Sequence, residues 1–397
     1  MSANPLSDRI NNLSVSQTLA MAAKARELTA LGKDIISLSL GEPDFNTPDF
    51  VKEAAKKAID ENWSKYPPVD GYAELKQAII KKFQRDNNLT YQPANIVVST
   101  GAKQALYNIA QAMINEGDEV ILPAPYWVSY SEIVKMAGGI PVEVPTTVES
   151  DFKITAEQLK NAITPKTKMM WFSSPCNPSG SVYNKEELTA LAAVLGQHEN
   201  IYVVSDEIYE HINFAGTSCS IASIPGMFDR TITVNGVAKA FAMTGWRIGY
   251  IGAPEFIAKA CTKLQGQVTS GANSIAQRAT IAALEADPSE IKYMVKAFHK
   301  RRDLVIDMLN DIPGLKVNKP EGAFYAFPDV SYYFGKNLNG TLINNADDLA
   351  MYLLEQANVA TVTGAAFGNP NCLRLSYATS EELLVEAFKR IKEALSK

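Results

Sequence analysis

The chain alternates short apolar runs with helical patterns from about residue 95 to 255, and this alternation restricts its fold more than any other feature. Short, nearly continuous apolar runs are typical of strands that are covered on both faces. Helical segments between such strands supply the right-handed crossovers that parallel strands need. We therefore predict an α/β fold whose mainly parallel mixed sheet is flanked by helices. The predicted strands are Ile96–Ser99, Val120–Leu122, Met169–Phe172, Ile201–Val204, Thr231–Val234 and Ile248–Ile251, and the helices include Lys103–Asn115, Ser129–Ala137 and Lys185–Gln197.

The pattern changes after about residue 285, where longer helices and isolated strands predict a smaller α+β domain. Near the other end, Ser16–Leu31 has a helical pattern, and Gly32 follows it as a C-cap. We assign residues 1–47 to an N-terminal arm and part of the small domain, 48–285 to a large domain, and 286–397 to the small C-terminal domain. The elements predicted in the last part are helices at Ile291–Leu309, Ala346–Gln356 and Glu381–Leu395, and strands at Gly322–Phe327 and Leu373–Tyr377.

Composition excludes several classes of function. The net charge of −5 over 397 residues provides no broad positive field, which argues against nucleic acid or a membrane surface as the main partner. The N-terminus lacks a signal-peptide pattern, and no apolar run is long enough to span a bilayer. Four scattered cysteines without a C-x-x-C pair predict reduced thiols and a cytoplasmic location. Three histidines without neighbours at ligand spacing argue against a metal site, so catalysis must depend on other groups.

Two loops that follow predicted strands have anion-binding or polar character. Ser99–Lys103 opens a helix with small residues, so its backbone N–H groups and the helix dipole favour an anion there. Ser174–Gly180 contains two prolines that fix the loop and leave the Asn177 amide free to point into a cleft. By itself, either loop is more often a simple turn.

Ionisable residues follow the next two strands. Asp206 ends one strand, where its carboxylate could pair with a cationic ligand, and Tyr209 would lie on the same face of a following helix. Lys239 has small or apolar neighbours, and burial there would lower its pKa as imine formation requires. Arg247, eight residues later, offers a bidentate donor for a phosphate. Each has an ordinary alternative as well: a helix cap, a solvated lysine, or a surface arginine.

An arginine inside an apolar strand completes the set. Arg374 in Leu373–Tyr377 needs an anionic partner if it is buried, and either a protein carboxylate or an amino acid substrate would serve. Together, the chain offers a phosphate cradle, a phosphate-binding arginine, a lysine for an aldehyde and an acid for a pyridinium nitrogen. Pyridoxal 5′-phosphate uses all four. The motifs for dinucleotides, nucleoside triphosphates and serine hydrolases are absent from the sequence.

Seven motifs occur in order over nearly the whole chain, and together they are far more specific than any one of them. With these motifs the chain resembles class I aminotransferases of pyridoxal-phosphate fold type I, most closely the bacterial aspartate aminotransferases of the Ib subgroup. The motifs are Gly41–Phe45, Gly101–Leu106, Pro125–Tyr130, Ser174–Gly180, Ser205–His211, Lys239–Gly249 and Arg374–Ser380.

The resemblance implies a role around the cofactor ring for each of five residues. Lys239 would form a Schiff base with the aldehyde and later act as the general base. Asp206 would keep the pyridine nitrogen protonated. Tyr209 and Asn177 would hydrogen-bond to the phenolic oxygen, and Trp127 would stack on the ring.

The resemblance further implies how the phosphate is held. The backbone of Gly101, Ala102 and Lys103 would bind it together with Arg247. Tyr66 would reach the phosphate of a neighbouring subunit, because active sites of this family form across a homodimer interface. Many relatives place a phosphate-binding serine three residues before the lysine, where this chain has Gly236, so its phosphate must depend on the other donors.

Substrate preference follows from the same resemblance. Gly41 and Arg374 would hold the α-carboxylate beside Trp127 and Asn177. Lys103 matches the position that recognises an acidic side chain, which favours aspartate as donor and 2-oxoglutarate as acceptor, with ping-pong kinetics. Relatives that accept prephenate carry a lysine where this chain has Ser14, which does not favour that activity. Three alternatives stay open: transamination of aromatic or aliphatic amino acids, a C–S lyase, and a cofactor-bound protein without turnover.

Overall fold

The computed structural model describes residues 5–216 and 219–396, and within them a seven-stranded mixed sheet forms the centre of the larger part of the chain. The strand order is β2-β8-β7-β6-β5-β3-β4, in which β8 runs antiparallel to both of its neighbours and the other pairs are parallel. These strands are β2 Ile96–Thr100, β3 Glu119–Ala124, β4 Ile140–Pro145, β5 Thr167–Ser173, β6 Tyr202–Asp206, β7 Thr231–Gly236 and β8 Ile248–Gly252.

Helices cover both faces of this sheet, which explains why its strands are apolar almost throughout. Side chains alternate along each strand, so neighbours enter different cores: Val120 and Trp171 pack in one cluster, and Ile121 and Met170 in another. The helices of this part are α3 Asp49–Asp60, α4 Ala73–Asn87, α5 Ala102–Met113, α6 Ser129–Met136, α7 Ala156–Ala162, α8 Lys185–Leu195, α9 Glu255–Val268 and α10 Ser274–Glu285.

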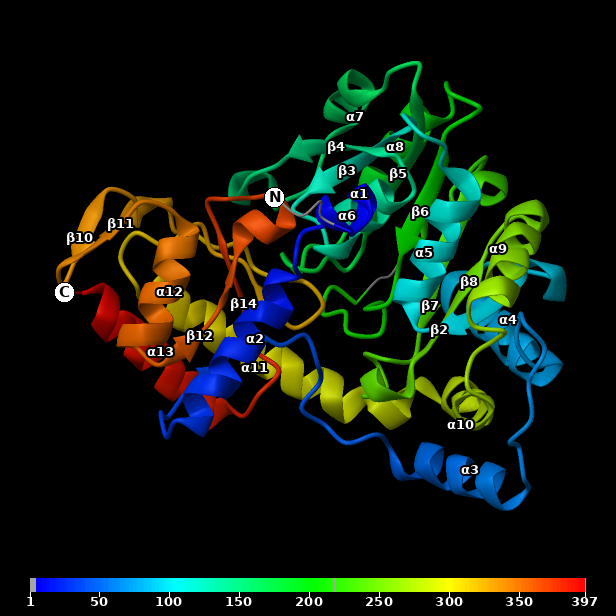
Figure 1. The fold of residues 1–397 in the computed structure, drawn as a ribbon, viewed down its shortest axis with the longest axis horizontal. Helices are drawn as coiled ribbons and strands as arrows, with labels where there is room; N and C mark the ends of the chain where they lie inside the picture. Colours follow the sequence, from blue (N-terminus) through cyan, green and yellow to red (C-terminus); the bar gives the residue numbers. More distant parts are fainter. Residues whose placement is uncertain (1–4, 217–218, 397) are drawn as a thin grey trace.

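The C-terminal elements form an α+β arrangement beside the sheet, and helix α2 joins them (Figure 1). Strand β1 pairs in parallel with β12, so the segment before residue 38 is tied to the C-terminal part. A second small sheet has the order β13-β14-β9. The elements are α2 Gln17–Ala30, β1 Ile36–Ser37, α11 Lys292–Asn310, β9 Tyr325–Ala326, β10 Lys336–Leu338, β11 Thr341–Ile343, α12 Ala346–Gln356, β12 Val359–Ala360, β13 Val362–Thr363, β14 Leu373–Ser376 and α13 Glu381–Leu395. The short helix α1 Asp8–Asn11 precedes α2 and is drawn near α6 (Figure 1).

The predicted α/β fold class is confirmed, and each of the six predicted strands of the large sheet is present. One local prediction is wrong: no helix begins after Asp206, because the residues that follow form turns. The Asp206 carboxylate accepts a hydrogen bond from the backbone N–H of Ile208 at 3.2 Å, and the Ile212 carbonyl accepts one from the N–H of Ala323. These contacts direct the chain toward β9 instead of into a helix. No helix in the described part of the chain is long and apolar enough to cross a membrane.

Candidate active site

A cleft of about 550 Å³ opens at the carboxyl ends of the parallel strands, where ligands gather in sheets of this kind. Its walls come from both parts of the chain: the loops after β5, β6 and β7, the start of α5, and strands β9 and β14. Most of the residues predicted from the sequence line it. These are Gly41, Ala102, Lys103, Trp127, Asn177, Asp206, Tyr209, Lys239, Arg247 and Arg374.

Lys239 lies in the turn after β7, and its side chain is partly buried. Its Nζ donates a hydrogen bond to the carbonyl oxygen of Gly41 at 2.6 Å. Removal from water is the largest influence on this ammonium and lowers the pKa of Lys239 to about 8. About a tenth of such amines are neutral at pH 7, far more than for a lysine in water, so Lys239 is suited to attack an aldehyde.

Asp206 ends β6 and is buried at the back of the cleft. The hydroxyl of Tyr130 donates to its Oδ2 at 2.7 Å, and the N–H of Ile208 donates to Oδ1. Burial raises the pKa of Asp206 to about 6, and the Tyr130 hydrogen bond opposes this change. A cationic ligand beside the carboxylate would offset its lost hydration. The site therefore suits a protonated ring nitrogen.

The opposite corner of the cleft is built for an anion. Gly101 has a φ of +79° and starts α5, and a Cβ there would lie 2.9 Å from the Cζ of Arg247. Gly249 is equally restricted, because a Cβ would collide with the backbone N of Ala102. Arg247 has a left-handed backbone with φ of +59° and is fixed by donation to the Thr244 carbonyl at 2.9 Å. The start of α5 and the guanidinium of Arg247 thus lie side by side, an arrangement that favours an anion.

Arg374 occupies the end of the cleft formed by β14, with only 1% of its surface exposed. Its Nη1 donates to Asn177 Oδ1 at 3.1 Å, and its Nη2 donates to the Ser39 carbonyl at 2.6 Å. Its Nε is buried without a hydrogen-bond partner. Both acceptors are neutral, so this guanidinium has a free donor and an uncompensated charge. It is suited to a carboxylate ligand.

Two tyrosines that the sequence analysis did not assign belong to the same site. Tyr130 holds Asp206, and Tyr325 hydrogen-bonds through its hydroxyl to Tyr209 at 2.8 Å. Tyr130 belongs to the motif Pro125–Tyr130, and Tyr325 belongs to the predicted strand Gly322–Phe327. Nothing in the sequence indicates which residue either hydroxyl contacts. Among the predicted residues, Tyr66 does not line the cleft, and 92% of its surface is exposed.

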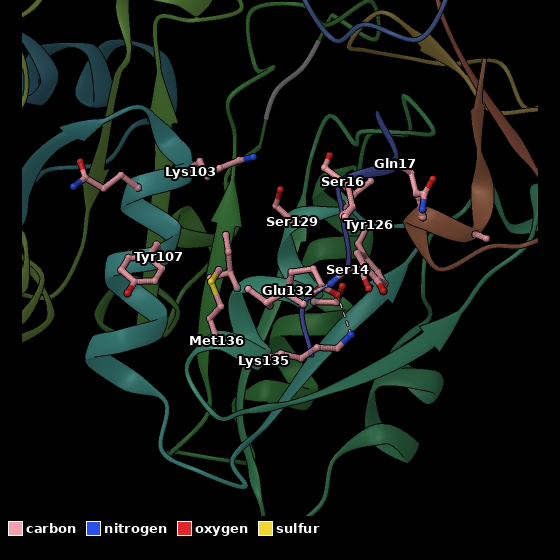
Figure 2. Close-up of a pocket in the computed structure, with 18 of the residues that line it drawn as sticks. Ser14, Ser16, Gln17, Lys103, Tyr107, Tyr126, Ser129, Glu132, Lys135 and Met136 are labelled. Carbon is pink, nitrogen blue, oxygen red and sulfur yellow. Dashed lines mark hydrogen bonds and ion pairs between the residues drawn. The ribbon is translucent and has the colours of Figure 1, made fainter. Parts of the chain in front are cut away.

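A second cavity of about 870 Å³ adjoins the cleft and shares Lys103 and Arg247 with it. Figure 2 shows Lys103 and Tyr107 of α5 on one side, and Glu132 and Met136 of α6 on the other. Residues 13–17 contribute to its rim, and the backbone N–H of Ser14 donates to Glu132 at 2.9 Å.

The cleft has the groups that suit a phosphate-bearing ligand: an amine, a buried carboxylate and an anion site, together with a second arginine for another anion. The unpartnered Arg374 Nε and the glycine-lined cradle fit a phosphorylated cofactor and a carboxylate substrate side by side. Comparisons with known proteins agree with this description. Residues 33–391 match the family model of aminotransferase class I and II.

Curated relatives align over nearly their whole length. An aspartate/prephenate aminotransferase of Cereibacter sphaeroides is 50% identical over 390 residues, which cover 98% of both chains. The aspartate aminotransferase of Bacillus subtilis is 47% identical over 394 residues, 99% of each chain. The crystal structure of the aspartate aminotransferase from Rhizobium meliloti superposes with a TM-score of 0.96 at 45% identity, over 99% of both chains.

The chain belongs to the class I and II aminotransferase family. It is a pyridoxal-phosphate-dependent transaminase with the fold type I architecture. The predicted family, cofactor and enzyme class are confirmed by these matches.

Proposed function

We propose that this enzyme transfers the amino group of L-aspartate to a 2-oxo acid, with 2-oxoglutarate as the main acceptor. The observation that carries the proposal is the buried Arg374, whose Nε has no partner in a cleft that also contains Lys239 and Asp206. Amino acids and 2-oxo acids share an α-carboxylate, and a guanidinium binds that group through paired hydrogen bonds.

Pyridoxal phosphate, when bound, supplies an aldehyde for the amino group and a ring that stabilises negative charge at the substrate's Cα. The Asp206 carboxylate would stabilise the positive charge of the protonated ring nitrogen. Tyr130 donates to this carboxylate and holds it in place. Tyr209 and Asn177 would donate to the phenolic oxygen, and Trp127 would cover the ring. The helix start at Gly101, Ala102 and Lys103 would bind the phosphate with Arg247.

Lys239 performs the proton transfers in this proposal. Its lowered pKa provides a neutral amine near pH 7, which could form an imine with the cofactor's aldehyde and would be free again once the substrate's amino group takes its place. The free Nζ would then take the proton from the substrate's Cα as general base, a role typically worth ~10²–10⁴ in rate. Arg374, which donates to Asn177, would hold the substrate's carboxylate so that this proton faces Lys239. Because Arg374 lies in the C-terminal part, binding of the carboxylate would draw both parts together and exclude water.

Lys103 supports the preference for an acidic substrate. Its Nζ lies 4.9 Å from the centre of the Trp127 ring at the edge of the cleft. Burial is the main cause that lowers the pKa of Lys103, and the positive charge of Arg247 nearby lowers it further. A second carboxylate on the substrate would pair with this ammonium. A relative points the same way: the structure of the Thermus thermophilus aspartate aminotransferase with maleate matches with a TM-score of 0.93 at 43% identity, over 99% of this chain and 100% of that one.

The test is a donor panel assayed with 2-oxoglutarate. Glutamate formation from aspartate, with parallel double-reciprocal lines, is the expected result, because the donor product must leave before the acceptor binds. Release of pyruvate and ammonia would instead identify a C–S lyase. Faster turnover of aromatic or aliphatic donors than of aspartate would refute the substrate assignment while leaving the enzyme class intact.

Prephenate belongs in the acceptor panel, because the relative that is 50% identical is named for it. The position that resemblance links to prephenate holds Ser14, which lines the second cavity and bonds to Glu132 through its backbone. Without a cation at that position, we expect prephenate to be a much poorer acceptor than 2-oxoglutarate.

We also propose a homodimer in which Tyr66 of one copy completes the phosphate site of the other. Support comes from the exposed Tyr66 ring and from the second cavity, which continues from Lys103 and Arg247 toward the surface. Mixing two inactive variants, Lys239→Ala and Tyr66→Ala, tests this. If each site combines Lys239 of one copy with Tyr66 of the other, a mixed dimer has one site with both substitutions and one site with neither, so activity returns. A mixture that forms mixed dimers and stays inactive would refute the arrangement.

Two organisational proposals complete this function. Pairing of β1 with β12 supports residues 1–47 as an arm and part of a small domain with 286–397, against a large domain at 48–285. The four cysteines are all unpaired, which supports a cytoplasmic location. Limited proteolysis with and without aspartate would test the domains, since cleavage should concentrate near residues 47 and 285.

A further inference from the structure

Tyr325 occupies a position between the cofactor end and the substrate end of the cleft. It lies in β9 and is completely buried. Its hydroxyl is 2.8 Å from the hydroxyl of Tyr209, and the Cζ of Arg374 lies 4.7 Å from the centre of its ring. A Cβ at Gly41 would lie 2.5 Å from the same hydroxyl, so the Tyr325 hydroxyl fits in this place only because residue 41 is a glycine. One side chain therefore contacts three elements of the site.

Each of the two hydroxyls has a single proton to donate, and this limit decides the direction of the hydrogen bond between Tyr209 and Tyr325 when the cofactor is present. Among the described residues, neither hydroxyl has another hydrogen-bond partner, so either one can donate in the free chain. If Tyr209 donates its only proton to the cofactor's phenolic oxygen, it can no longer donate to Tyr325. Tyr325 must then donate to Tyr209, or two buried oxygens lose their hydrogen bond.

We propose that Tyr325 is a positioning residue that acts through Tyr209: it donates to the Tyr209 hydroxyl, aims and strengthens that hydroxyl's donation to the cofactor, and supports the guanidinium of Arg374 with its ring. This inference rests on the proposed role of Tyr209. Hydrogen bonds in a chain polarise one another, so the outer donor strengthens the inner one. The flat ring below Arg374 restricts the guanidinium by a cation–π contact without satisfying its Nε.

Tyr325→Phe separates the two functions, because it removes the hydroxyl and keeps the ring. Donation from Tyr209 draws electron density from the phenolic oxygen, and that oxygen in turn helps the neighbouring Lys239 nitrogen keep its proton. A weaker donation should raise the pH midpoint of the absorbance change of the Lys239-linked cofactor. We expect an upward shift on the order of 0.3 pH unit, since one hydrogen bond strengthens the next by ~10–30%. Tyr209→Phe should produce a larger shift.

The double variant is the decisive measurement. If Tyr325 acts through Tyr209, adding Tyr325→Phe to Tyr209→Phe produces no further shift, which is the non-additivity expected of coupled residues. Tyr377→Phe is the matched control: Tyr377 is also buried, but its hydroxyl donates to the Ala323 carbonyl at 3.3 Å and does not line the cleft. It should leave the midpoint unchanged.

A substrate readout tests the ring. Tyr325→Phe should leave the affinity for maleate within about twofold of the parent, and Tyr325→Leu should weaken it about fivefold or more, because only the second change removes the support of Arg374. Thermal unfolding of the cofactor-free proteins checks that each variant folds.

The inference would be overturned if Tyr325→Phe left the pH midpoint unchanged. It would also be overturned if Tyr325→Phe shifted the midpoint equally in the parent protein and in the Tyr209→Phe variant. These outcomes differ from failure of the proposed function. In that case the parent protein would show no absorbance band from a Lys239-linked cofactor, whatever stands at position 325.

Discussion

Replacing Lys239 by methionine should make the cofactor-free protein more stable at neutral pH. The ammonium is partly buried and its hydrogen-bond acceptor, the Gly41 carbonyl, is neutral. Its pKa of about 8, compared with 10.5 in water, records the free energy of holding this charge in the cleft. At 1.36 kcal/mol per pKa unit the cost is up to about 3.4 kcal/mol. Partial contact with water and the lost Gly41 hydrogen bond reduce the net gain to about 1–2 kcal/mol.

The pH dependence gives this prediction its sign. Below pH 8 Lys239 is charged in both the folded and the unfolded chain, so the full cost is present. Between pH 8 and 10.5 the folded chain releases its proton while the unfolded chain keeps it, so the parent protein gains stability relative to the variant. The difference in unfolding free energy between Lys239→Met and the parent should therefore narrow over this range.

Urea unfolding at pH values of about 7 and about 9.5, followed by tryptophan fluorescence at one protein concentration, measures the difference. Lys82→Met is the control, because Lys82 is fully buried but ion-paired with Glu210 and hydrogen-bonded to Asn87 at 2.7 Å. Its removal takes away the lysine that pairs with the buried Glu210 carboxylate and should destabilise the protein by about 3–5 kcal/mol. A Lys239→Met protein that is less stable than the parent at pH 7, or a difference that does not change with pH, would refute the reasoning.

Three further changes test the site. Arg374→Gln should raise KM for aspartate about 100-fold, the loss expected for a charge-assisted pair, and a KM within threefold of the parent in steady-state assays would contradict this role. Lys103→Met should lower kcat/KM about tenfold for aspartate and much less for an uncharged donor; an equal loss for both donors would remove its role in selectivity. Tyr130→Phe should raise the pKa of Asp206 further and shift the acidic limit of cofactor binding to higher pH, as measured by absorbance from about pH 5 to 8, and an unmoved limit would argue against this contact.

Most of the large sheet could be predicted because its strands are buried on both faces, and burial leaves a continuous apolar signal. The strand β4 was missed for the opposite reason. It lies at the edge of the sheet, contains Pro141 and Pro145, and is largely exposed, so it has neither the apolar run nor the composition of a central strand. The turns after Asp206 depend on hydrogen bonds with Glu321 and Ala323, just before β9 and more than 100 residues away, which no local pattern encodes.

Site residues could be predicted where the chemistry needs one particular side chain. Residues that only hold another side chain in place by a hydrogen bond could not. Lys239, Asp206 and Arg374 have unusual side chains for buried positions that follow or lie in strands. Tyr130 and Tyr325 are ordinary buried aromatics in sequence, and only the fold reveals that their hydroxyls meet Asp206 and Tyr209.

The short segment from Ser39 to Gly41 links the two ends of the cleft. The carbonyl of Ser39 accepts from Arg374, and the carbonyl of Gly41 accepts from Lys239, both at 2.6 Å. Leu38 accepts from the backbone of Ser376 beside them, so the segment is tied to β14. When Lys239 becomes linked to the cofactor, its nitrogen can no longer serve Gly41 as an ammonium donor. The contact between Ser39 and Arg374 does not involve this nitrogen, so the backbone support of the carboxylate site does not depend on the state of Lys239.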